Sequence, residues 1–429
     1  MPQPAAEAGT RILYRARCLV PMAGPPLDDG GLLVADGTLA AVGPFAHLAA
    51  AGRHQHSVDL GEVVVLPPLA NAHTHLELTH YPRWSAIDTP FRGDFTDWLL
   101  HLVGVLRDIP PQDFAPSLAD GLQTLLRFGT GAVGDVLSRL PARSAYRGTP
   151  LAGRVFLEVL GVFEDLFQRR LNQLRPILKR RPAAALDYGL TPHAPYTLTQ
   201  KGLGRCLELA RRHHLPLAMH LAESPAEVQL LDSGDGPLAE RFYPAVGWRE
   251  KMPAATGLSP VAWLVNGRAL PPGMLLVHGV QVGPEDIPLL TGHGVTVVLC
   301  PRSNEQLGVG TAPVADYLAA GVPLALGTDS LASSGSLSLW DEMAAARRLY
   351  GGCLTPPQLL HLATRDGARV LGLEGRMGTL QAGWGAHFQA LRPDSQPAPG
   401  ELFEYLCSPK RPEEIQALYL DGREVLHSG

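Results

Sequence analysis

The sequence is poor in lysine, so nearly all of its positive charge is carried by arginine. Its only lysines are Lys179, Lys201, Lys251 and Lys410. The net charge is −5 over 429 residues and no stripe of basic residues occurs, which argues against a nucleic-acid partner. The most basic cluster, Lys179-Arg180-Arg181, is short and typical of a solvated helix end.

The sequence also lacks paired cysteines, a leader segment and long apolar runs. The five cysteines are scattered and form no CxxC pair, which predicts reduced thiols rather than a disulfide framework. The first ten residues contain neither a basic nor an apolar stretch, and no run reaches the roughly 18 apolar residues of a membrane span. We therefore predict a cytoplasmic protein that acts on a small molecule, has no membrane partner, and could form a homo-oligomer.

Both ends of the chain are rich in short strand-like segments. Residues 11–66 contain RILYRARCLV, GGLLVADGTLAAVG and GEVVVL, and residues 415–426 read IQALYLDGREVL. Asp36-Gly37 and Asp421-Gly422 lie between apolar runs and indicate hairpin turns. We predict a composite β-sandwich domain made of residues 1–66 and 380–429.

The middle of the chain alternates between apolar runs and helical patterns. Eight runs between residues 67 and 330 are candidate strands, and segments such as 94–109 and 200–214 have helical spacing. Buried strands with helical crossovers predict an α/β fold, and eight repeats favour a (β/α)8 TIM-like barrel over residues 67–379. An open doubly wound sheet is the alternative, but no GxGxxG follows the first run.

Most of these candidate strands end in a polar side chain that can take part in chemistry. His73 and His75 follow the first run, and alternate residues of a strand point to the same side. HxH alone is more often explained by packing. With His220 and Asp329 at other strand ends, however, three imidazoles and a carboxylate could hold one divalent metal, either Zn²⁺ or Fe²⁺.

Each of these residues also has a purely structural interpretation. His220 could be a core histidine with its hydrogen bonds satisfied, and Glu223 could be a carboxylate favoured by a helix N-terminus. Asp329, which precedes Ser-Leu-Ala, could be a helix N-cap. The functional interpretation makes Glu223 a general acid or base, and lets His278 and Asp329 orient a water molecule and accept its proton.

Five segments, HTH, HLAE, HG, CPRSN and GTDS, occur in this order and resemble the amidohydrolase superfamily, in its cytosine/adenosine-type deaminase and chlorohydrolase branch. The resemblance extends over nearly the whole chain, including the tail 363–386. It implies that His73, His75, His220 and Asp329 hold one metal, with Zn²⁺ expected and Fe²⁺ as the alternative. It also implies that Glu223, His278 and Asp329 are catalytic. Superfamily members with two metals usually carry a modified lysine at the end of strand four, whereas here that strand ends TPHAP.

The resemblance further suggests a 6-aminopurine nucleoside as the substrate. TPHAPYTLT is similar to a nucleoside-binding stretch of these deaminases, so His193 is a candidate contact to purine or ribose. Trp98 could stack on the base or belong to the core, and Ser303 and Asn304 could line the pocket or turn the chain. NAHTHLELT and HLAESPAEVQLLDSGDGP resemble the bacterial aminodeoxyfutalosine deaminases of menaquinone biosynthesis. A carboxylated substrate of this kind would call for an arginine, for which the candidates are Arg83, Arg92 and Arg302.

Several alternatives stay open at this point. The substrate could be S-adenosylhomocysteine or methylthioadenosine, or the enzyme could deaminate or dechlorinate guanine, cytosine or a triazine. A dinuclear amidase or lactonase and a non-catalytic metal-binding scaffold are further options. The tail reads Gly385-Ala386-His387 where the family has Asp after Ala, so the packing at the domain junction is expected to differ.

Overall fold

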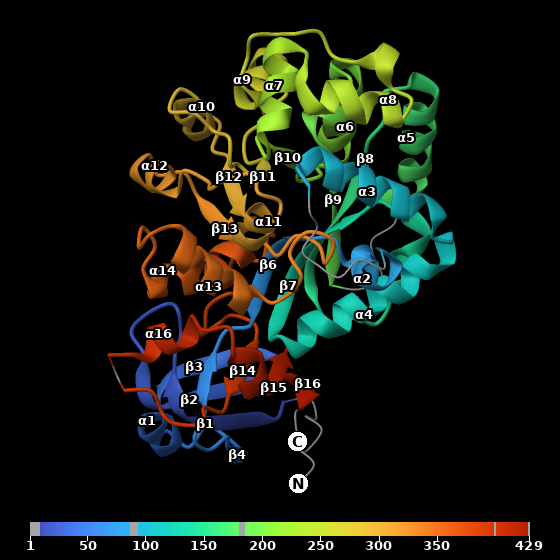
Figure 1. Cartoon of the computed structure of the whole chain (residues 1–429). Helices are drawn as coiled ribbons and strands as arrows, with labels where there is room; N and C mark the ends of the chain where they lie inside the picture. Colours follow the sequence, from blue (N-terminus) through green and yellow to red (C-terminus); the bar gives the residue numbers. More distant parts are fainter. Residues whose placement is uncertain (1–8, 86–92, 180–184, 399, 428–429) are drawn as a thin grey trace.

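The computed structural model describes residues 9–85, 93–179, 185–398 and 400–427. Its larger part contains eight short, fully or largely buried strands that alternate with helices (Figure 1). These strands are β6 (Leu69–Thr74), β7 (Thr130–Leu137), β8 (Ala152–Val159), β9 (Leu186–Pro192), β10 (Ala218–Leu221), β11 (Leu275–His278), β12 (Thr296–Leu299) and β13 (Leu324–Leu326). All eight coincide with the apolar runs that the sequence marks as strands.

The eight strands form two parallel sheets of four, ordered β6-β7-β8-β9 and β10-β11-β12-β13. The sheets meet at two parallel bridges, Leu190↔Leu217 and Thr74↔Asp329. At the second junction the amides of Thr328 and Asp329 donate to the carbonyl of His73, at 3.0 and 3.2 Å. The two sheets are thus joined at both of their edges, which agrees with the predicted TIM-like barrel.

One glycine makes the second junction possible. A Cβ at Gly327 would lie 2.8 Å from both Cβ and the carbonyl oxygen of His73. Only a residue without a side chain lets the end of β13 approach β6 so closely. This junction therefore brings Asp329 next to the first histidine pair.

Helices surround the strands and connect them. The α-helices are α1 (Phe45–Ala50), α2 (Tyr81–Ser85), α3 (Phe95–Asp108), α4 (Phe114–Arg127), α5 (Glu164–Leu178), α6 (Gln200–His213), α7 (Pro225–Ser233), α8 (Tyr243–Ala245), α9 (Pro260–Asn266), α10 (Ile287–Gly292), α11 (Pro301–Gln306), α12 (Val314–Ala319), α13 (Leu339–Leu349), α14 (Pro356–His361), α15 (Gly367–Val370) and α16 (Leu402–Leu406). Short 3-10 or π segments are η1 (Leu76–Leu78), η2 (Pro111–Asp113), η3 (Leu140–Tyr146), η4 (Pro195–Thr197), η5 (Leu238–Phe242), η6 (Arg249–Lys251), η7 (Leu362–Asp366) and η8 (Arg411–Glu414).

The two helices that the sequence indicates most clearly have well-defined ends. Asp94 and Asp97 form a capping box at the start of α3, and the hydroxyl of Thr199 caps α6 by accepting from the amide of Gly202. Such side-chain oxygens satisfy amides that lack a partner inside the helix. His214 ends α6 in the left-handed conformation, with φ 53°.

The remaining strands come from both ends of the chain and form one mixed sheet. They are β1 (Arg11–Leu19), β2 (Leu27–Ala35), β3 (Thr38–Pro44), β4 (His56–Asp59), β5 (Val64–Leu66), β14 (Phe388–Leu391), β15 (Ile415–Leu420) and β16 (Arg423–His427). Their order is β16-β15-β14-β5-β1-β2-β3, with β4 beside β1. Figure 1 shows the blue N-terminal strands and the red C-terminal strands together at the bottom of the view.

This sheet curls around a core of its own. The rings of Tyr14, Phe388 and Tyr419 pack within it, with centroids 4.3–5.5 Å apart. Its two hairpins turn at Asp36-Gly37 and Asp421-Gly422, where all four residues have positive φ, as a type I′ turn requires. The predicted β-domain from both termini is confirmed, and its strands form one continuous curled sheet. The boundaries at 66/67 and 379/380 stay a prediction.

The departure from the family pattern at the tail has a local structural consequence. His387 is buried, and its Nδ1 accepts a hydrogen bond from the amide of Asp421 at 3.1 Å. This histidine thus supports the second hairpin turn. Among the described residues, no helix is both long and apolar enough to cross a membrane.

Candidate active site and metal centre

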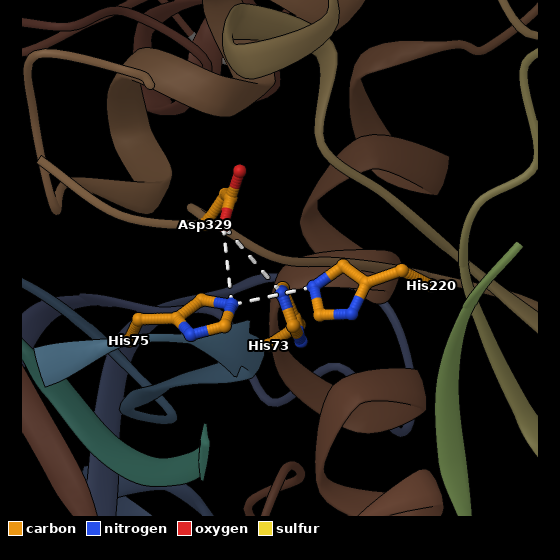
Figure 2. A group of neighbouring side chains, drawn as sticks. All are labelled: His73, His75, His220 and Asp329. Carbon is orange, nitrogen blue, oxygen red and sulfur yellow. Dashed lines mark hydrogen bonds and ion pairs between the residues drawn. The ribbon is translucent and has the colours of Figure 1, made fainter. Parts of the chain in front are cut away.

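Four side chains of the ligand types that metals prefer converge at one end of the barrel. His73, His75, His220 and Asp329 each offer an atom within 4.8 Å of the others (Figure 2). Nε2 of His75 lies 3.3 Å from Nε2 of His220, and Oδ1 of Asp329 lies 3.6 and 3.5 Å from Nε2 of His73 and His75. Residues that are 256 positions apart in the sequence are therefore neighbours in space.

The barrel strands deliver these groups to one place. His73 is in β6, His220 is in β10, and His75 and Asp329 lie just beyond strand ends. Asp329 has φ 54°, and so falls in the left-handed region that residues with a side chain rarely adopt. Such strain persists only where the surrounding structure enforces it, and it is frequent at functional sites.

The donor set fits a bound metal ion. Nε2 of His73 is buried and, within the described structure, has no hydrogen-bond partner. Two nitrogens that each bind a tetrahedral ion at about 2.0–2.1 Å lie roughly 3.3–3.4 Å apart, which matches the separation between His75 and His220. Burial lowers the pKa of all three histidines, that of His75 to about 4, and the neutral imidazole is the form that binds metals.

Further hydrogen bonds orient two of the four groups, His220 and Asp329. Nδ1 of His220 lies 3.2 Å from the carbonyl oxygen of His193, which directs Nε2 into the cluster. The hydroxyls of Ser303 and Ser333 donate to Oδ2 of Asp329 at 2.7 and 2.6 Å, leaving Oδ1 to face the histidines. Partners of this kind fix the geometry of metal ligands.

Beside the cluster lies a buried pair of proton-transfer groups. Oε1 of Glu223 is 3.4 Å from Nε2 of His278, and both side chains are almost fully buried. Nδ1 of His278 lies 2.9 Å from Oδ1 of Asn304. Because an amide oxygen only accepts, the proton of the neutral ring is on Nδ1, and Nε2 has its lone pair toward Glu223.

Burial shifts the pKa of both members of this pair. It raises the pKa of Glu223 well above its usual value, and the charge of Asp329 raises it further. Burial lowers the pKa of His278, which Asp329 and Asn304 only partly oppose. Burial therefore favours the protonated carboxyl of Glu223 and the neutral imidazole of His278.

A cavity of about 500 Å³ opens above the cluster. Its floor includes His75, His220, Glu223, His278 and Asp329. Its outer wall is apolar and comes from α3 and from the segment 242–248. Pockets of 300–1,000 Å³ with few polar groups among apolar walls are typical small-molecule sites.

The amidohydrolase family model matches residues 64–425, which is most of the chain. This protein is an amidohydrolase. The aminodeoxyfutalosine deaminase of Deinococcus radiodurans is 35% identical to it over 370 residues, covering 83% of this chain and 84% of that protein. The 5-methylthioadenosine/S-adenosylhomocysteine deaminase of Syntrophobacter fumaroxidans is 32% identical over 374 residues, covering 84% of this chain and 79% of that protein.

Solved structures share the fold of this amidohydrolase. The Helicobacter pylori aminofutalosine deaminase has a TM-score of 0.84 at 21% identity, covering 97% of this chain and all of that one. A zinc-bound adenosine deaminase from Xanthomonas campestris has a TM-score of 0.79 at 24% identity, covering 98% of this chain and 94% of that one. The predictions of the superfamily, of the barrel fold and of a hydrolytic deaminase with a small-molecule substrate are confirmed by these relatives.

The amidohydrolase has ligand-type groups for one divalent metal in its barrel. All four lysines belong to the described residues, and none follows a barrel strand. Lys179 ends α5, Lys201 is in α6, Lys251 is in η6, and Lys410 precedes η8. His193 follows β9 directly, as the sequence indicates for strand four.

The structure brings only some of the predicted substrate-binding residues to the cavity. His193 and Trp98 line it, although Nε1 of Trp98 also donates to the carbonyl of Ala332 at 2.9 Å. Ser303 and Asn304 do not line it, because they are hydrogen-bonded to Asp329 and His278 instead.

The two predicted arginines that the structure describes, Arg83 and Arg302, do not line the cavity. Arg302 lies 3.8 and 3.9 Å from the carboxylates of Asp341 and Glu342, away from the cavity. Arg83 is exposed on α2 and is not part of the cavity wall. Arg92 lies outside the described residues, as does most of the Lys179-Arg180-Arg181 cluster.

Sequence reasoning missed several charged and polar residues of the cavity wall. These are Glu77, Arg107, Ser138, Arg139, Glu158 and Arg170. Ser138 and Glu158 lie at the ends of β7 and β8, so their strand-end positions were a signal that the sequence analysis did not use. Arg107, Arg139 and Arg170 lie on helices and loops, where spacing alone does not show which way a side chain points.

Proposed function

We propose that this amidohydrolase is a deaminase that hydrolyses the 6-amino group of a purine nucleoside. A single Zn²⁺, or alternatively Fe²⁺, would be held by His73, His75, His220 and Asp329. The observation that carries the proposal is the position of the Glu223–His278 pair. It lies beside this four-residue cluster, in the floor of the same cavity.

When bound, such a metal would act as a Lewis acid. It would lower the pKa of a water molecule, which makes that water a better nucleophile near neutral pH. The remaining work falls to side chains of this chain. Glu223 holds a proton in a position to protonate the ring nitrogen next to the carbon that loses its amino group. Protonation there withdraws electrons from the ring and favours addition of water to that carbon.

His278 and Asp329 act on the attacking water. In the neutral ring of His278 the proton is on Nδ1, so Nε2 can accept a proton from the water. Oδ2 of Asp329 accepts hydrogen bonds from Ser303 and Ser333, whereas Oδ1 faces Nε2 of His73 and His75. Oδ1 can therefore orient the water as well as contribute to the metal site.

The upper cavity supports a nucleoside with an extension at its 5′ position. Leu99, Leu102 and Leu106 of α3 face this space together with Phe242 and Trp248. An apolar wall of this kind would accommodate an aromatic or alkyl group. Arg107 and Arg139 are exposed residues of the same wall and could pair with a terminal carboxylate.

These features favour aminodeoxyfutalosine as the specific substrate. Its deamination would give this enzyme a role in menaquinone biosynthesis. Aminodeoxyfutalosine is the compound that the Deinococcus radiodurans relative is named for, and it combines an aromatic extension with a carboxylate. 5-Methylthioadenosine and S-adenosylhomocysteine, for which the Syntrophobacter relative is named, are the second candidates.

An ammonia-release screen tests the proposal. Protein reconstituted with zinc or iron is incubated with adenosine, methylthioadenosine, S-adenosylhomocysteine, aminodeoxyfutalosine, guanine, cytosine and a chlorotriazine, and chloride release is measured for the chlorotriazine because its dechlorination produces no ammonia. We expect ammonia from the 6-aminopurine nucleosides and the highest kcat/KM with aminodeoxyfutalosine. Turnover of only guanine, cytosine or the triazine would refute the proposal, and two metals per chain would favour a dinuclear enzyme.

A further inference from the structure

Glu158 is a further buried carboxylate in the cavity wall, outside the metal cluster and the Glu223–His278 pair. It lies in β8, is 4% exposed and faces the cavity. Its Oε2 accepts a hydrogen bond from the hydroxyl of Ser138. Its Oε1 is buried and has no hydrogen-bond partner within the described part of the chain. A buried carboxylate oxygen without a donor is costly, so its presence suggests a ligand that supplies one.

The neighbouring Glu77 lines the same cavity but does not share this feature, and the other buried glutamates with an unpartnered oxygen, Glu227 and Glu342, do not line the cavity. Glu77 accepts hydrogen bonds at both oxygens, from the amides of Ser138 and Arg139 at 3.2 and 2.9 Å. Glu77 therefore has its partners within the protein, whereas Glu158 has one oxygen left over.

Neighbouring residues hold Glu158 in place and favour its charged form. Burial alone would raise the pKa of Glu158, but the hydrogen bond from Ser138 and the positive charge of Arg170 act in the opposite direction. Arg170 also donates to the carbonyl of Glu158 at 2.7–2.9 Å. Its Nη2 reaches the carbonyl of Ser138 at 2.7 Å and so joins the ends of β7 and β8.

We propose that Glu158 is the specificity residue that binds the vicinal hydroxyls of the nucleoside sugar. A carboxylate oxygen has two lone pairs, and two adjacent hydroxyl groups can both donate to one carboxylate. Glu158 is not part of the group that could hold the metal. Arg170 beside it makes a second cation there unfavourable, so a neutral donor is the ligand that fits.

The position of Glu158 around the ring agrees with this assignment, which rests on the proposed function. Glu158 is at the end of the third barrel strand and His193 follows the fourth, while Glu223 follows the fifth. In a purine nucleoside the sugar is attached at the far end of the ring system from the nitrogen that Glu223 would protonate. With the base on the floor between Glu223 and His193, the sugar lies toward Glu158.

The test compares two substrates in matched variants. The best nucleoside of the ammonia screen and its 2′,3′-dideoxy counterpart are assayed with wild type, Glu158→Gln and Glu158→Asp, and metal content is measured in each. We expect kcat/KM of the wild type to be about 10- to 100-fold higher for the hydroxylated nucleoside than for its dideoxy counterpart. The dideoxy compound cannot make the hydrogen bonds to the charged carboxylate. In Glu158→Gln this preference should fall to near unity, with one metal per chain retained. Glu158→Asp should lose part of the preference for the hydroxylated nucleoside.

Glu77→Gln is the matched control, because it removes a cavity carboxylate whose oxygens are already occupied. It should change the rates with both nucleosides by the same factor. If Glu158→Gln also lowers both rates equally, or keeps the wild-type preference, the assignment is wrong. If the wild type releases no ammonia from any 6-aminopurine nucleoside, the proposed function itself fails, and this is established before the variants are compared.

Discussion

Replacing Glu223 by glutamine should remove most turnover while leaving both the fold and the metal site intact. Glu223 is 4% exposed and is not among the four residues that could hold the metal. Burial raises the pKa of Glu223 well above the usual value and so favours the neutral carboxyl, whose shape and charge glutamine copies. The amide of glutamine cannot, however, transfer a proton to the ring nitrogen of the substrate.

The expected loss follows from what could replace this proton. Positioned general acids typically contribute about 10²- to 10⁴-fold in rate. The nearest alternative is Nε2 of His278, 3.4 Å from Oε1 of Glu223, but its ring is neutral and donates its proton to Asn304 through Nδ1. We therefore expect the upper part of the range, about 10³- to 10⁴-fold in kcat, or about 4–5.5 kcal/mol in activation free energy.

The assay measures kcat by ammonia release, metal content by elemental analysis and stability by denaturant unfolding. Glu223→Gln should keep one metal per chain and unfold within about 1 kcal/mol of the wild type. Glu208→Gln is the control for the chemical change alone. Glu208 is 57% exposed and pairs only with Arg212 on the surface of α6, so its loss should leave kcat unchanged.

Two results would refute the reasoning. A Glu223→Gln enzyme with kcat within about tenfold of wild type would show that this carboxyl does not deliver the essential proton. Loss of the metal in this variant would show instead that Glu223 belongs to the metal site, contrary to the geometry.

Three further predictions concern the groups around this centre. Asp329→Ala should lower the metal content from one per chain toward zero and abolish activity, and an unchanged content would reject Asp329 as a ligand. Ser303→Ala removes a 2.7 Å hydrogen bond to Oδ2 of Asp329 and should weaken metal affinity by about 10- to 100-fold in a chelator competition; equal affinity would contradict this. Burial raises the pKa of Asp135 to about 8, so the folded state binds a proton that the unfolded state releases near pH 4. The free energy of unfolding should therefore fall by up to about 1.4 kcal/mol per pH unit between pH 5 and 8 in wild type relative to Asp135→Asn; parallel pH profiles would contradict this.

The local patterns of the sequence were sufficient for the secondary structure and for the metal cluster. Apolar runs of strand length identified all eight barrel strands, because buried parallel strands have no polar face to interrupt them. The Asp-Gly pairs identified both hairpins, because that dipeptide readily adopts two successive positive φ angles. His73, His75, His220 and Asp329 could be proposed together because strand ends of a barrel converge.

The substrate-binding residues could not be predicted in the same way. Ser303 and Asn304 lie near a strand end just as His278 and Asp329 do, yet their side chains are hydrogen-bonded to those two residues and do not line the cavity. Arg302, the neighbour of Ser303, turns toward Asp341 and Glu342. Strand-end position predicts proximity to the site, but not which side of a short helix such as α11 faces it.

The sequence by itself therefore determined the barrel, the two-ended sheet and the identity of the four groups that converge, since each depends on local periodicity or on a rule of topology. Only the tertiary structure decided how these groups are arranged and what surrounds them. The 3.3 Å contact of His75 with His220, the unpartnered oxygen of Glu158 and the arginines of the cavity wall all depend on contacts between distant segments. Side-chain direction at such contacts is set by packing against neighbours far away in the chain, and spacing along one strand or helix does not contain that information.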